Sequence, residues 1–445
     1  MLLDVAKKYE NSLFAWIRGK YYSYGDILFE YERVKRIIAS KNMDEKTVVL
    51  VFDGSFLSIV TFLVLIDEGY VVALVKDEDV FCEKKAVLSS CKYFLRFVDG
   101  DISLNCLERN SIPNLLTTFL KKKSAGIIIF SSGTSGEPKG VLHDARKILN
   151  PHEGSREKKR KLILFLEMDH IGGLNTFFGA YYGGSTLLVP VKKNVFEVCE
   201  LIEKEQADIL PTTPSFLNMM YLCKAFENHD LSSLKIISYG TEKMRLDLLE
   251  KLSKKITNVK FMQTYGLSEL GIMKTASKND SSIQMKIGGA GFEYKIVNDE
   301  LLIKSDFAME GYLNADSPFD NDGWYNTHDI VKVKQDGFLE ILGRNTDVVN
   351  INGLKCNLLE IEEAVMNNFD DIEDCLAFIE KHPVFGSILG MKIKCLTVVN
   401  EREFKKYFYS RCNTILPKYM VPIKVVFTDK ELNSYRWKKE RNKIN

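Results

Sequence analysis

Runs of branched apolar residues alternate with helix-period stretches through the first three-quarters of the chain. Val48–Phe52 and Val71–Val75 have the pattern of buried strands, and Ser55–Asp67 between them has the spacing of a helix. The alternation recurs further along, with a strand at Lys161–Leu166, a helix at Val195–Glu205 and a strand at Ile209–Leu210. Strands joined by helices are typical of parallel sheets, so the pattern predicts an α/β fold with helix-covered parallel sheets.

The pattern changes around Ile283–Leu342, where short strands and glycine-rich turns replace the strand–helix alternation. Glu293–Val297 followed by Glu300–Ser305 is an example of two such strands in succession. We therefore expect a small β-rich subdomain at the end of the large N-terminal part.

A domain boundary is predicted near Gly343–Thr346. Beyond it, Asn357 is a candidate N-cap with Glu360 at the capping-box position. The apolar stripe of that helix would consist of Leu358, Ile361, Val365 and Phe369. The last hundred residues have strand and helix patterns of their own, which is enough for a small α+β domain. We therefore expect a large N-terminal domain at residues 1–344 and a small C-terminal domain at residues 345–445.

The charge balance excludes some classes of partner. The 61 basic and 60 acidic residues leave a net charge of +1, which argues against nucleic acid or a membrane surface as the main partner. The basic runs Lys121–Lys123 and Arg156–Lys161 are interpreted as solvated loops, with contact to an acidic carrier protein as the weaker alternative. The most apolar window, Val48–Val75, contains several charges, so we expect no membrane span.

The nine cysteines are scattered singly, without C-x-x-C pairs or metal-ligand spacing. This distribution favours reduced thiols over a disulfide framework or a zinc site. The N-terminal residues lack the long apolar core of a signal peptide. We therefore expect a cytoplasmic protein.

The segment Ile127–Asp144 carries the most informative chemistry of the chain. An apolar run ending at Phe130 predicts a buried strand, which leads into four hydroxylated residues and three glycines. Backbone N–H groups and hydroxyls of such a stretch can converge on an anion, and Lys139 adds a positive charge. The spacing is not that of a Walker loop, because Gly140 follows the lysine. A flexible Ser/Gly linker is the alternative interpretation. The candidate phosphate-binding residues are Ser131, Ser132, Gly133, Thr134, Ser135, Gly136 and Lys139.

This loop resembles, almost letter for letter, the phosphate loop of the adenylate-forming ligase superfamily. That superfamily includes acyl- and aryl-CoA synthetases, peptide-synthetase adenylation domains and luciferases. The resemblance implies a large N-terminal domain followed by a mobile C-terminal lid. Further motifs match in the family's order, from Tyr24–Leu28 to the last residues, so the resemblance covers essentially the whole chain.

The segment Gln263–Glu269 resembles the family's aromatic-Gly-x-[ST]-Glu motif. An aromatic ring can stack on adenine, a hydroxyl can bond a phosphate, and a carboxylate can hold Mg²⁺ between phosphates. By resemblance, Tyr265 packs on adenine, next to Gly266. Ser268 then contacts the α-phosphate and Glu269 binds the metal. A strand that ends in a turn is the alternative interpretation.

Two later motifs would complete the nucleotide site. Asp322–Asp329 resembles the family's G-W-x-x-T-G-D segment, in which Asp329 would accept both ribose hydroxyls. His328 stands where the family has glycine, and a positive φ there would cost about 1 kcal/mol or more. By resemblance, Arg344 meets ribose or phosphate, and Gly353 lies where the thiol-bearing arm of the acceptor passes.

The acid and adenine pockets have weaker signals. Gly240 and Thr241 stand where relatives place a glycine-rich strand end beside adenine. Met168–Leu174 resembles the aromatic-His-x-x-Gly segment next to the acid pocket, so His170 is a candidate for lining the carboxylate site. A lone histidine is nevertheless more often a structural residue. Ile171 follows, where amino-acid-activating relatives have a carboxylate that pairs the substrate ammonium.

Lys438 is the candidate catalytic lysine of the C-terminal tail. Leu416–Pro422 matches the family's Leu-Pro-x-Tyr-Met-x-Pro segment, and Lys438 and Arg441 keep the K-x-x-R spacing of its final element. Trp437 stands where the family has glycine. A solvated basic terminus is the alternative, because a Lys/Arg-rich tail supplies such spacings by chance.

The resemblance implies an ATP-dependent carboxylic acid ligase. With Mg²⁺, it would convert ATP and a small carboxylic acid to an acyl-adenylate and pyrophosphate. It would then pass the acyl group to a thiol of coenzyme A or of the phosphopantetheine on a separate acyl carrier protein. Two alternatives stay open. One is a stand-alone amino-acid-adenylating enzyme, which Ile171 disfavours, and the other is a non-catalytic nucleotide-binding relative, suggested by His328, Thr346 and Trp437.

Overall fold

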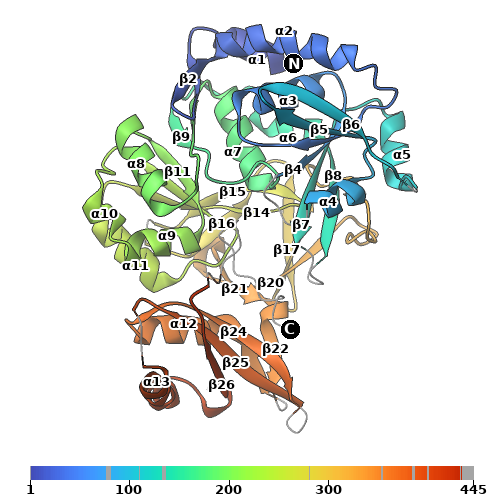
Figure 1. The fold of residues 1–445 in the computed structure, drawn as a ribbon. Helices are drawn as coiled ribbons and strands as arrows, with labels where there is room; N and C mark the ends of the chain where they lie inside the picture. The colour runs from blue at the N-terminus through green and yellow to red at the C-terminus, as the bar shows by residue number, and fades with distance from the viewer. Residues whose placement is uncertain are drawn as a thin grey trace.

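The computed structural model of the 445-residue chain describes residues 2–76, 82–109, 111–132, 137–279, 281–351, 354–382, 386–397, 400–430 and 432. These residues form a mixed α/β fold with three seven-stranded sheets and two smaller ones. The N-terminal helices lie at one end of the molecule and the C-terminal elements at the other (Figure 1).

The first sheet has the strand order β13-β12-β11-β9-β10-β1-β2 and is parallel except for β2. Its strands are β1 (Leu13–Ile17), β2 (Lys20–Ser23), β9 (Lys161–Ile163), β10 (Thr186–Val189), β11 (Ile209–Thr212), β12 (Ile236–Tyr239) and β13 (Lys260–Gln263). The strand expected at Lys161–Leu166 is therefore three residues shorter than the apolar pattern suggested.

The second sheet has the order β19-β8-β7-β4-β3-β5-β6. Its middle strands β7, β4, β3 and β5 are parallel, while β6, β8 and β19 run antiparallel to their neighbours. The strands are β3 (Thr47–Val51), β4 (Val71–Val75), β5 (Tyr93–Val98), β6 (Asp101–Cys106), β7 (Gly126–Ser132), β8 (Pro138–Asp144) and β19 (Gly311–Tyr312).

Helices and sheets alternate in layers because the parallel strands are apolar on both faces. In β3, Val48 and Leu50 face the central core, while Val49 and Val51 face a second core under α4 (Cys82–Ser89) and α5 (Asn114–Lys121). The central core also holds residues of the first sheet and of two almost wholly buried helices, α3 (Phe56–Asp67) and α7 (Ile171–Tyr182).

The remaining helices cover the outside of these layers. The outer face of the first sheet packs against α8 (Val195–Glu205), α9 (Pro214–Leu222) and α11 (Leu246–Lys255). The other helices are α1 (Leu2–Lys8), α2 (Tyr24–Ser40), α6 (Ala145–Leu149) and α10 (Ala225–Asn228). The predicted helix-covered parallel sheets are thus confirmed, and α8 has the predicted bounds.

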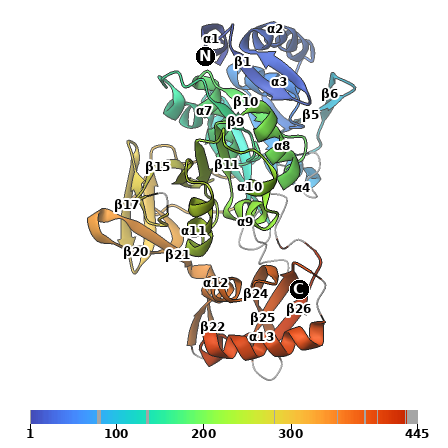
Figure 2. The ribbon, with the colours of Figure 1, turned by 90° about the vertical axis from the view of Figure 1, so that its left-hand side faces the viewer.

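The third sheet is antiparallel throughout, with the order β14-β15-β16-β21-β20-β18-β17, and it has its own core (Figure 2). Its strands are β14 (Tyr265–Leu267), β15 (Gly271–Ser277), β16 (Met285–Gly288), β17 (Phe292–Val297), β18 (Glu300–Ser305), β20 (Tyr325–Val333) and β21 (Leu339–Arg344). The β-rich subdomain is confirmed, and it begins at Tyr265, well before the expected start.

Described residues between Val349 and Phe427 gather around a separate apolar core. Asn357 caps α12, as predicted, and all four predicted stripe residues are buried; among the described residues Glu360 makes no capping-box bond and is exposed. The boundary at 344/345 stays a prediction. The elements are β22 (Val348–Ile351), β23 (Leu354–Asn357), α12 (Leu358–Asn368), β24 (Ile372–His382), β25 (Gly386–Cys395), α13 (Glu401–Ile415) and β26 (Lys424–Phe427).

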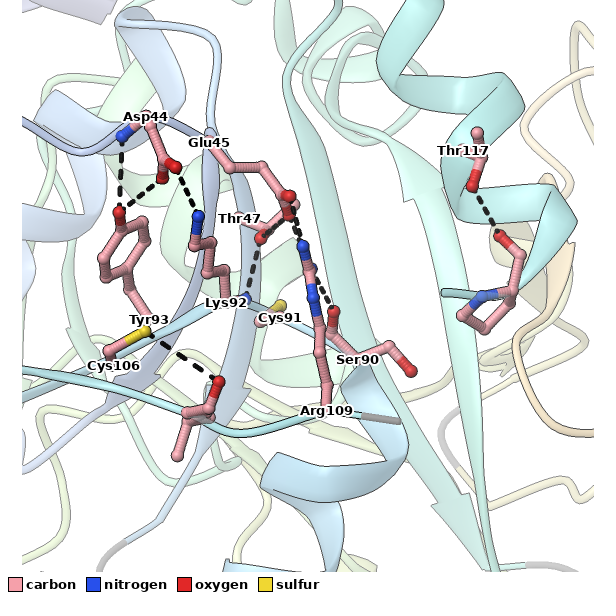
Figure 3. Close-up of polar contacts among 12 residues, drawn as sticks. Asp44, Glu45, Thr47, Ser90, Cys91, Lys92, Tyr93, Cys106, Arg109 and Thr117 are labelled. Atoms are coloured by element: carbon pink, nitrogen blue, oxygen red, sulfur yellow. Dashed lines mark hydrogen bonds and ion pairs between the residues drawn. The ribbon is translucent and has the colours of Figure 1, made fainter. Parts of the chain in front are cut away.

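A cluster of paired charges, here called the edge cluster, lies where β3 begins and β5 and β6 pair (Figure 3). Lys92 and Tyr93 both bond to the Asp44 carboxylate, Tyr93 with a hydroxyl distance of 2.6 Å. Arg109 binds the Glu45 carboxylate through both terminal nitrogens, one of them at 2.7 Å. Each carboxylate of the edge cluster therefore has a cationic partner.

Membrane-spanning helices and cysteine pairing were the two remaining features considered in the sequence. Among the described residues, no helix combines the length and the apolar character that crossing a membrane requires. All nine cysteines lie within the described residues, and no disulfide joins them there.

Candidate active site

The candidate phosphate loop lies in a hairpin between β7 and β8. Ser131 pairs with Lys139 and Ser132 with Pro138 across antiparallel strands, so the strand runs two residues further than its apolar pattern suggested. Gly133, Thr134, Ser135 and Gly136 lie outside the described residues. Lys139 is a strand residue, which fixes its backbone beside the base of the loop.

The segment Met309–Asn314, here called the clamp, ties this hairpin to the predicted metal carboxylate. Asn314 accepts a hydrogen bond from the Gly140 N–H at 2.9 Å and donates one to the Pro138 carbonyl at 2.9 Å. The Met309 N–H donates to the backbone carbonyl of Glu269 at 2.9 Å. Between these anchors, β19 pairs with β8. The clamp therefore fixes the distance between the loop and the motif at 265–269.

Tyr312 of the clamp holds the Glu269 carboxylate. Its hydroxyl donates to Oε1 of Glu269 at 2.8 Å, and the ammonium of Lys139 lies 4.9 Å from the centroid of its ring. Burial and the negative charge of Glu269 both raise the pKa of the Tyr312 phenol, so the phenol stays protonated and keeps donating.

Glu269 is 6% exposed, and among the described residues no lysine, arginine or histidine forms an ion pair with it. A buried carboxylate that lacks a cationic partner pays a desolvation cost. A cation that binds there would offset that cost. No cluster of three or more His, Cys, Asp or Glu side chains suited to a metal occurs in the described part of the chain. Glu269 supplies a single buried carboxylate, and Mg²⁺ commonly binds one carboxylate together with phosphates and waters. The residues around Glu269 therefore fit Mg²⁺.

Asp329, in β20 of the third sheet, belongs to a second polar group. It accepts hydrogen bonds from the Tyr265 hydroxyl and from Nε of Arg344, the latter at 3.2 Å. Tyr265 and Asp329 are buried, and burial followed by the charge of Asp329 raises the pKa of Tyr265 well above its usual value. Residues from β14, β20 and β21, predicted separately for adenine, ribose and phosphate, are thus brought together.

Close backbone approaches explain the two candidate glycines near this group. A Cβ on Gly240 would lie 2.3 Å from Oγ1 of Thr264, and one on Gly266 would lie 2.7 Å from the Gly271 carbonyl. Thr241 has a φ of +70°, in the left-handed region. The end of β12 is therefore packed tightly against the start of the 265–269 motif, as expected for one continuous pocket wall.

Comparison with known proteins decides the family. The AMP-binding enzyme family model matches residues 64–313, more than half of the chain. The chain belongs to the AMP-binding enzyme family. The peroxisomal OPC-8:0-CoA ligase 1 of Arabidopsis thaliana is 28% identical over 300 residues, which cover 60% of this chain and 55% of that protein. A probable CoA ligase of Humulus lupulus is 26% identical over 295 residues, 59% of this chain and 53% of the relative.

The chain therefore spans about half the length of the curated relatives it matches. A crystal structure of an anthranilate CoA ligase in complex with anthranoyl-AMP has a TM-score of 0.78 at 16% identity and covers 98% of this chain and 95% of that one. At this identity the likeness shows the fold alone. The fold of an adenylate-forming enzyme with a C-terminal domain is thus confirmed.

His328 departs from the glycine that the AMP-binding family resemblance led us to expect. Its φ is +58°, so the position does require the left-handed backbone. Its N–H bonds to the Asn326 side chain at 2.8 Å, and its exposed ring lies 3.9 Å from Glu300. The histidine therefore holds a backbone conformation that costs free energy, and its ring is exposed next to Glu300.

His170 caps a helix in this AMP-binding enzyme, and its expected place beside the carboxylate site stays a prediction. It is the N-cap of α7, and its Nδ1 accepts the Gly172 N–H at 3.2 Å. The remaining candidates, Gly353 and Lys438, lie outside the described residues. The C-terminal elements meet the N-terminal part through Lys243 and Glu363, whose charged atoms are 2.9 Å apart.

Sequence reasoning missed the residues of the clamp. Tyr312 and Asn314 belong to no local motif, and they reach Glu269 and the phosphate hairpin only because β19 pairs with β8. A short strand of two residues leaves no periodic signal. His143 was also missed: it is fully buried, and its Nε2 lies 2.7 Å from the Ser268 carbonyl.

Proposed function

We propose that this AMP-binding enzyme is an ATP-dependent carboxylic acid ligase. It would form an acyl-adenylate and pyrophosphate, and then transfer the acyl group to a thiol of coenzyme A or of the phosphopantetheine on an acyl carrier protein. The observation that carries the proposal is the buried carboxylate of Glu269, which lacks a cationic partner among the described residues and is clamped to a phosphate-loop hairpin. A cation and a polyphosphate together complete that arrangement.

In the first step, a carboxylate oxygen of the acid attacks the α-phosphorus, the bond to the β-phosphate oxygen breaks, and pyrophosphate leaves with its electron pair. The hairpin from Ser131 to Lys139 would hold the phosphates, and Ser268 would contact the α-phosphate. Mg²⁺ bound at Glu269 would neutralise charge on the phosphate oxygens. Lys438, by resemblance, would stabilise the charge that develops on them.

The adenosine part would bind at the second polar group. Asp329 can accept both ribose hydroxyls, because Tyr265 and Arg344 already fix the orientation of its carboxylate. Gly240, Thr241 and Gly266 would form the adjoining wall beside adenine. Tyr265, whose ring is buried and whose hydroxyl is committed to Asp329, would contact the base through its ring edge or face.

In the second step, a thiolate attacks the acyl carbon, the bond to the adenylate oxygen breaks, and AMP leaves. By resemblance the C-terminal residues rotate between the steps, so that Lys438 leaves the site and the Gly353 segment approaches the acceptor's arm. The ion pair of Lys243 with Glu363 would belong to one of these two orientations. A cytoplasmic location, which a CoA-dependent reaction suits, remains part of the proposal.

The acid should lack an α-ammonium group. Ile171, at the position of the ammonium-pairing carboxylate in amino-acid-activating relatives, is 3% exposed. A buried ammonium without a partner costs several kcal/mol.

The deciding experiment measures pyrophosphate release with MgATP and separate panels of aliphatic, aryl, hydroxy and amino acids. Release with simple acids and not with amino acids supports the proposal. Turnover of an amino acid alone would make the protein an amino-acid-adenylating enzyme, and no release with any panel would make it a non-catalytic nucleotide-binding relative. Adding coenzyme A or a phosphopantetheinylated carrier protein to the productive reaction then identifies the acceptor.

A further inference from the structure

A cavity of about 30 Å³ is lined by His143, whose ring bonds to the Ser268 carbonyl. Its other walls come from α6 and the Pro151–His152 turn after it, the first two turns of α7, the start of β15 and two phenylalanines. The residues that matter here are His143, Ile171, Asn175, Ile272, Phe292 and Phe307. Ile171 follows the His170 cap, and Ile272 lies three residues after Glu269, so the cavity is next to the proposed site of adenylation.

His143 lines this cavity and carries a buried nitrogen without a hydrogen-bond partner among the described residues. Its Nε2 lies 2.7 Å from the carbonyl oxygen of Ser268, which can only accept, so Nε2 carries the hydrogen. Burial lowers the pKa of the imidazole to about 4, so the ring is neutral and Nδ1 is an acceptor. Nδ1 is buried and has no hydrogen-bond partner among the described residues. A buried polar atom of this kind costs free energy unless a donor meets it.

The other groups of the cavity limit what that donor can be. Lys147 is committed, since its ammonium bonds to the Ala308 carbonyl at 2.9 Å and the Glu310 carboxylate at 2.8 Å. Burial lowers the pKa of His152 to about 4, so it is neutral as well. The Phe292 and Phe307 rings, 5.3 Å apart, make the wall apolar. A charged tail would be poorly solvated there, whereas a small neutral donor would fit both the chemistry and the volume.

We propose that this cavity receives a hydroxyl group at the far end of the carboxylic acid substrate, and that His143 selects for it by accepting its hydrogen at Nδ1. This inference rests on the proposed ligase function and specifies its substrate as a neutral hydroxy acid. Asn175 lines the same cavity, and none of the hydrogen bonds within the described residues engages its amide. It can donate to the oxygen of the same hydroxyl.

The test compares matched acids that end in a hydroxyl or in a methyl group of similar size. The set includes aliphatic acids of increasing length and the 4-hydroxyphenyl and 4-methylphenyl pair. At the length that reaches the cavity, the wild type should favour the hydroxy acid at least about tenfold in kcat/KM for pyrophosphate release, because an unpaired buried acceptor penalises the methyl analogue. His143→Leu should bring that ratio to within about threefold. His143→Gln, which again offers an N–H and an acceptor oxygen, should restore part of the preference.

The matched control is His229→Leu, which removes a half-buried histidine paired with Glu203 far along the chain and should keep the wild-type ratio. If His143→Leu does not fold, Asn175→Leu gives the same comparison. A wild-type ratio near one at every length, or a ratio that survives His143→Leu, would mean that the cavity holds only water and would overturn the inference while leaving the ligase function standing. Absence of pyrophosphate release with both kinds of acid would instead refute the ligase function.

Discussion

Glu45 and Glu269 are both largely buried glutamates, yet the chain treats their charges in opposite ways. Glu45 in the edge cluster accepts two bonds from Arg109 and a third from the Thr47 hydroxyl at 2.5 Å (Figure 3). Glu269 is held by the phenol of Tyr312 and has no ion-pair partner within the described residues. The ion pair is expected to make Glu45 a stabilising carboxylate, whereas we propose that Glu269 is kept for a cation that binds with the nucleotide. The contrast holds for these two glutamates, while Asp329, the proposed ribose ligand, is itself paired with Arg344.

The largest effect should come from removing Lys438, the lysine whose ammonium the resemblance assigns to the phosphates. Lys438→Ala should lower acyl-adenylate formation by about 10³, because a positioned ammonium stabilises developing phosphate charge far better than mobile surface lysines do. Thioester formation from a pre-made acyl-adenylate should stay nearly intact. Rapid-quench assays of the two half-reactions measure this, with Lys439→Ala as the neighbouring control. If Lys438→Ala forms the acyl-adenylate at the normal rate, then either another residue has this role or the tail is only a solvated terminus.

Glu269→Gln should lower pyrophosphate release by about 10² while the protein stays folded, because the described residues hold no group of carboxylates that could bind the metal in its place. The same change should leave the thermal unfolding midpoint unchanged or raise it, since it removes a buried charge that lacks a cationic partner. A release rate within about threefold of wild type would refute the metal assignment.

Glu45→Gln should show the reverse pattern. It leaves the Arg109 guanidinium without its carboxylate and should lower the free energy of unfolding by about 2 kcal/mol. The rate of pyrophosphate release should not change. Urea denaturation and the activity assay, applied to this variant and to Glu269→Gln side by side, test the contrast directly. Equal losses of activity in Glu45→Gln and Glu269→Gln would contradict the proposed difference between the two glutamates.

The contributions of Glu45 and His143 to stability should be lost over different ranges of pH. The hydrogen bonds from Arg109 hold the pKa of Glu45 below its usual 4.5, so its contribution to stability is present above pH 4.5 and is lost as the pH falls through the lower, folded-state pKa. His143 has a folded pKa of about 4 against a usual 6.5, so the unfolded state binds the proton first and stability falls between pH 6.5 and 4.

Acidification from pH 7 to 5 should therefore cost the wild type about 1–2 kcal/mol more than His143→Leu. Glu45→Gln should change the profile mainly below pH 4.5. Urea titrations at half-unit pH steps measure both. A wild-type profile that is flat between pH 7 and 5 would mean that His143 is accessible to protons in the folded state.

The smallest effect concerns His328. Replacing it by glycine should raise the free energy of unfolding by about 0.5–1 kcal/mol, because the left-handed backbone strain is relieved while the unfolded chain gains some entropy. Activity should be unchanged, since the ring is exposed next to Glu300, which has no part in the proposed reaction. A loss of stability in His328→Gly would show that the contact with Glu300 outweighs the strain.

Local patterns were sufficient for much of the fold. Apolar runs of four or more residues located β3, α3 and β4, and the end of α8 fell at the predicted residue. Periodicity failed where polar residues continue a strand, as at Ser131 and Ser132, because hydrogen bonding to β8 and not apolar burial extends it. It also gave too late a start for the antiparallel sheet, whose first strand lies inside a motif interpreted by its chemistry.

The site was predicted in parts and not as an assembly. Motifs indicated Tyr265, Asp329 and Arg344 one by one, while their mutual bonds depend on how β14, β20 and β21 come together in the third sheet. Tyr312 and Asn314 have no motif, because their function comes from their place opposite β8. His143 looked like any strand residue, and only its burial and its bond to the Ser268 carbonyl distinguish it.

The clamp also has a consequence for how activity is lost. A two-residue strand, at the end of a seven-stranded sheet, carries the phenol that orients Glu269 and leads into the amide that braces the phosphate hairpin. Met309 and Tyr312 of the clamp belong to the central core, and Leu313 belongs to the second core. Detaching the clamp would therefore open both cores as well as break its bonds to β8 and to Glu269. The residues that orient the candidate metal carboxylate are thus secured by the same packing that holds the fold, so we expect loss of activity and loss of stability to accompany each other when the clamp is disrupted.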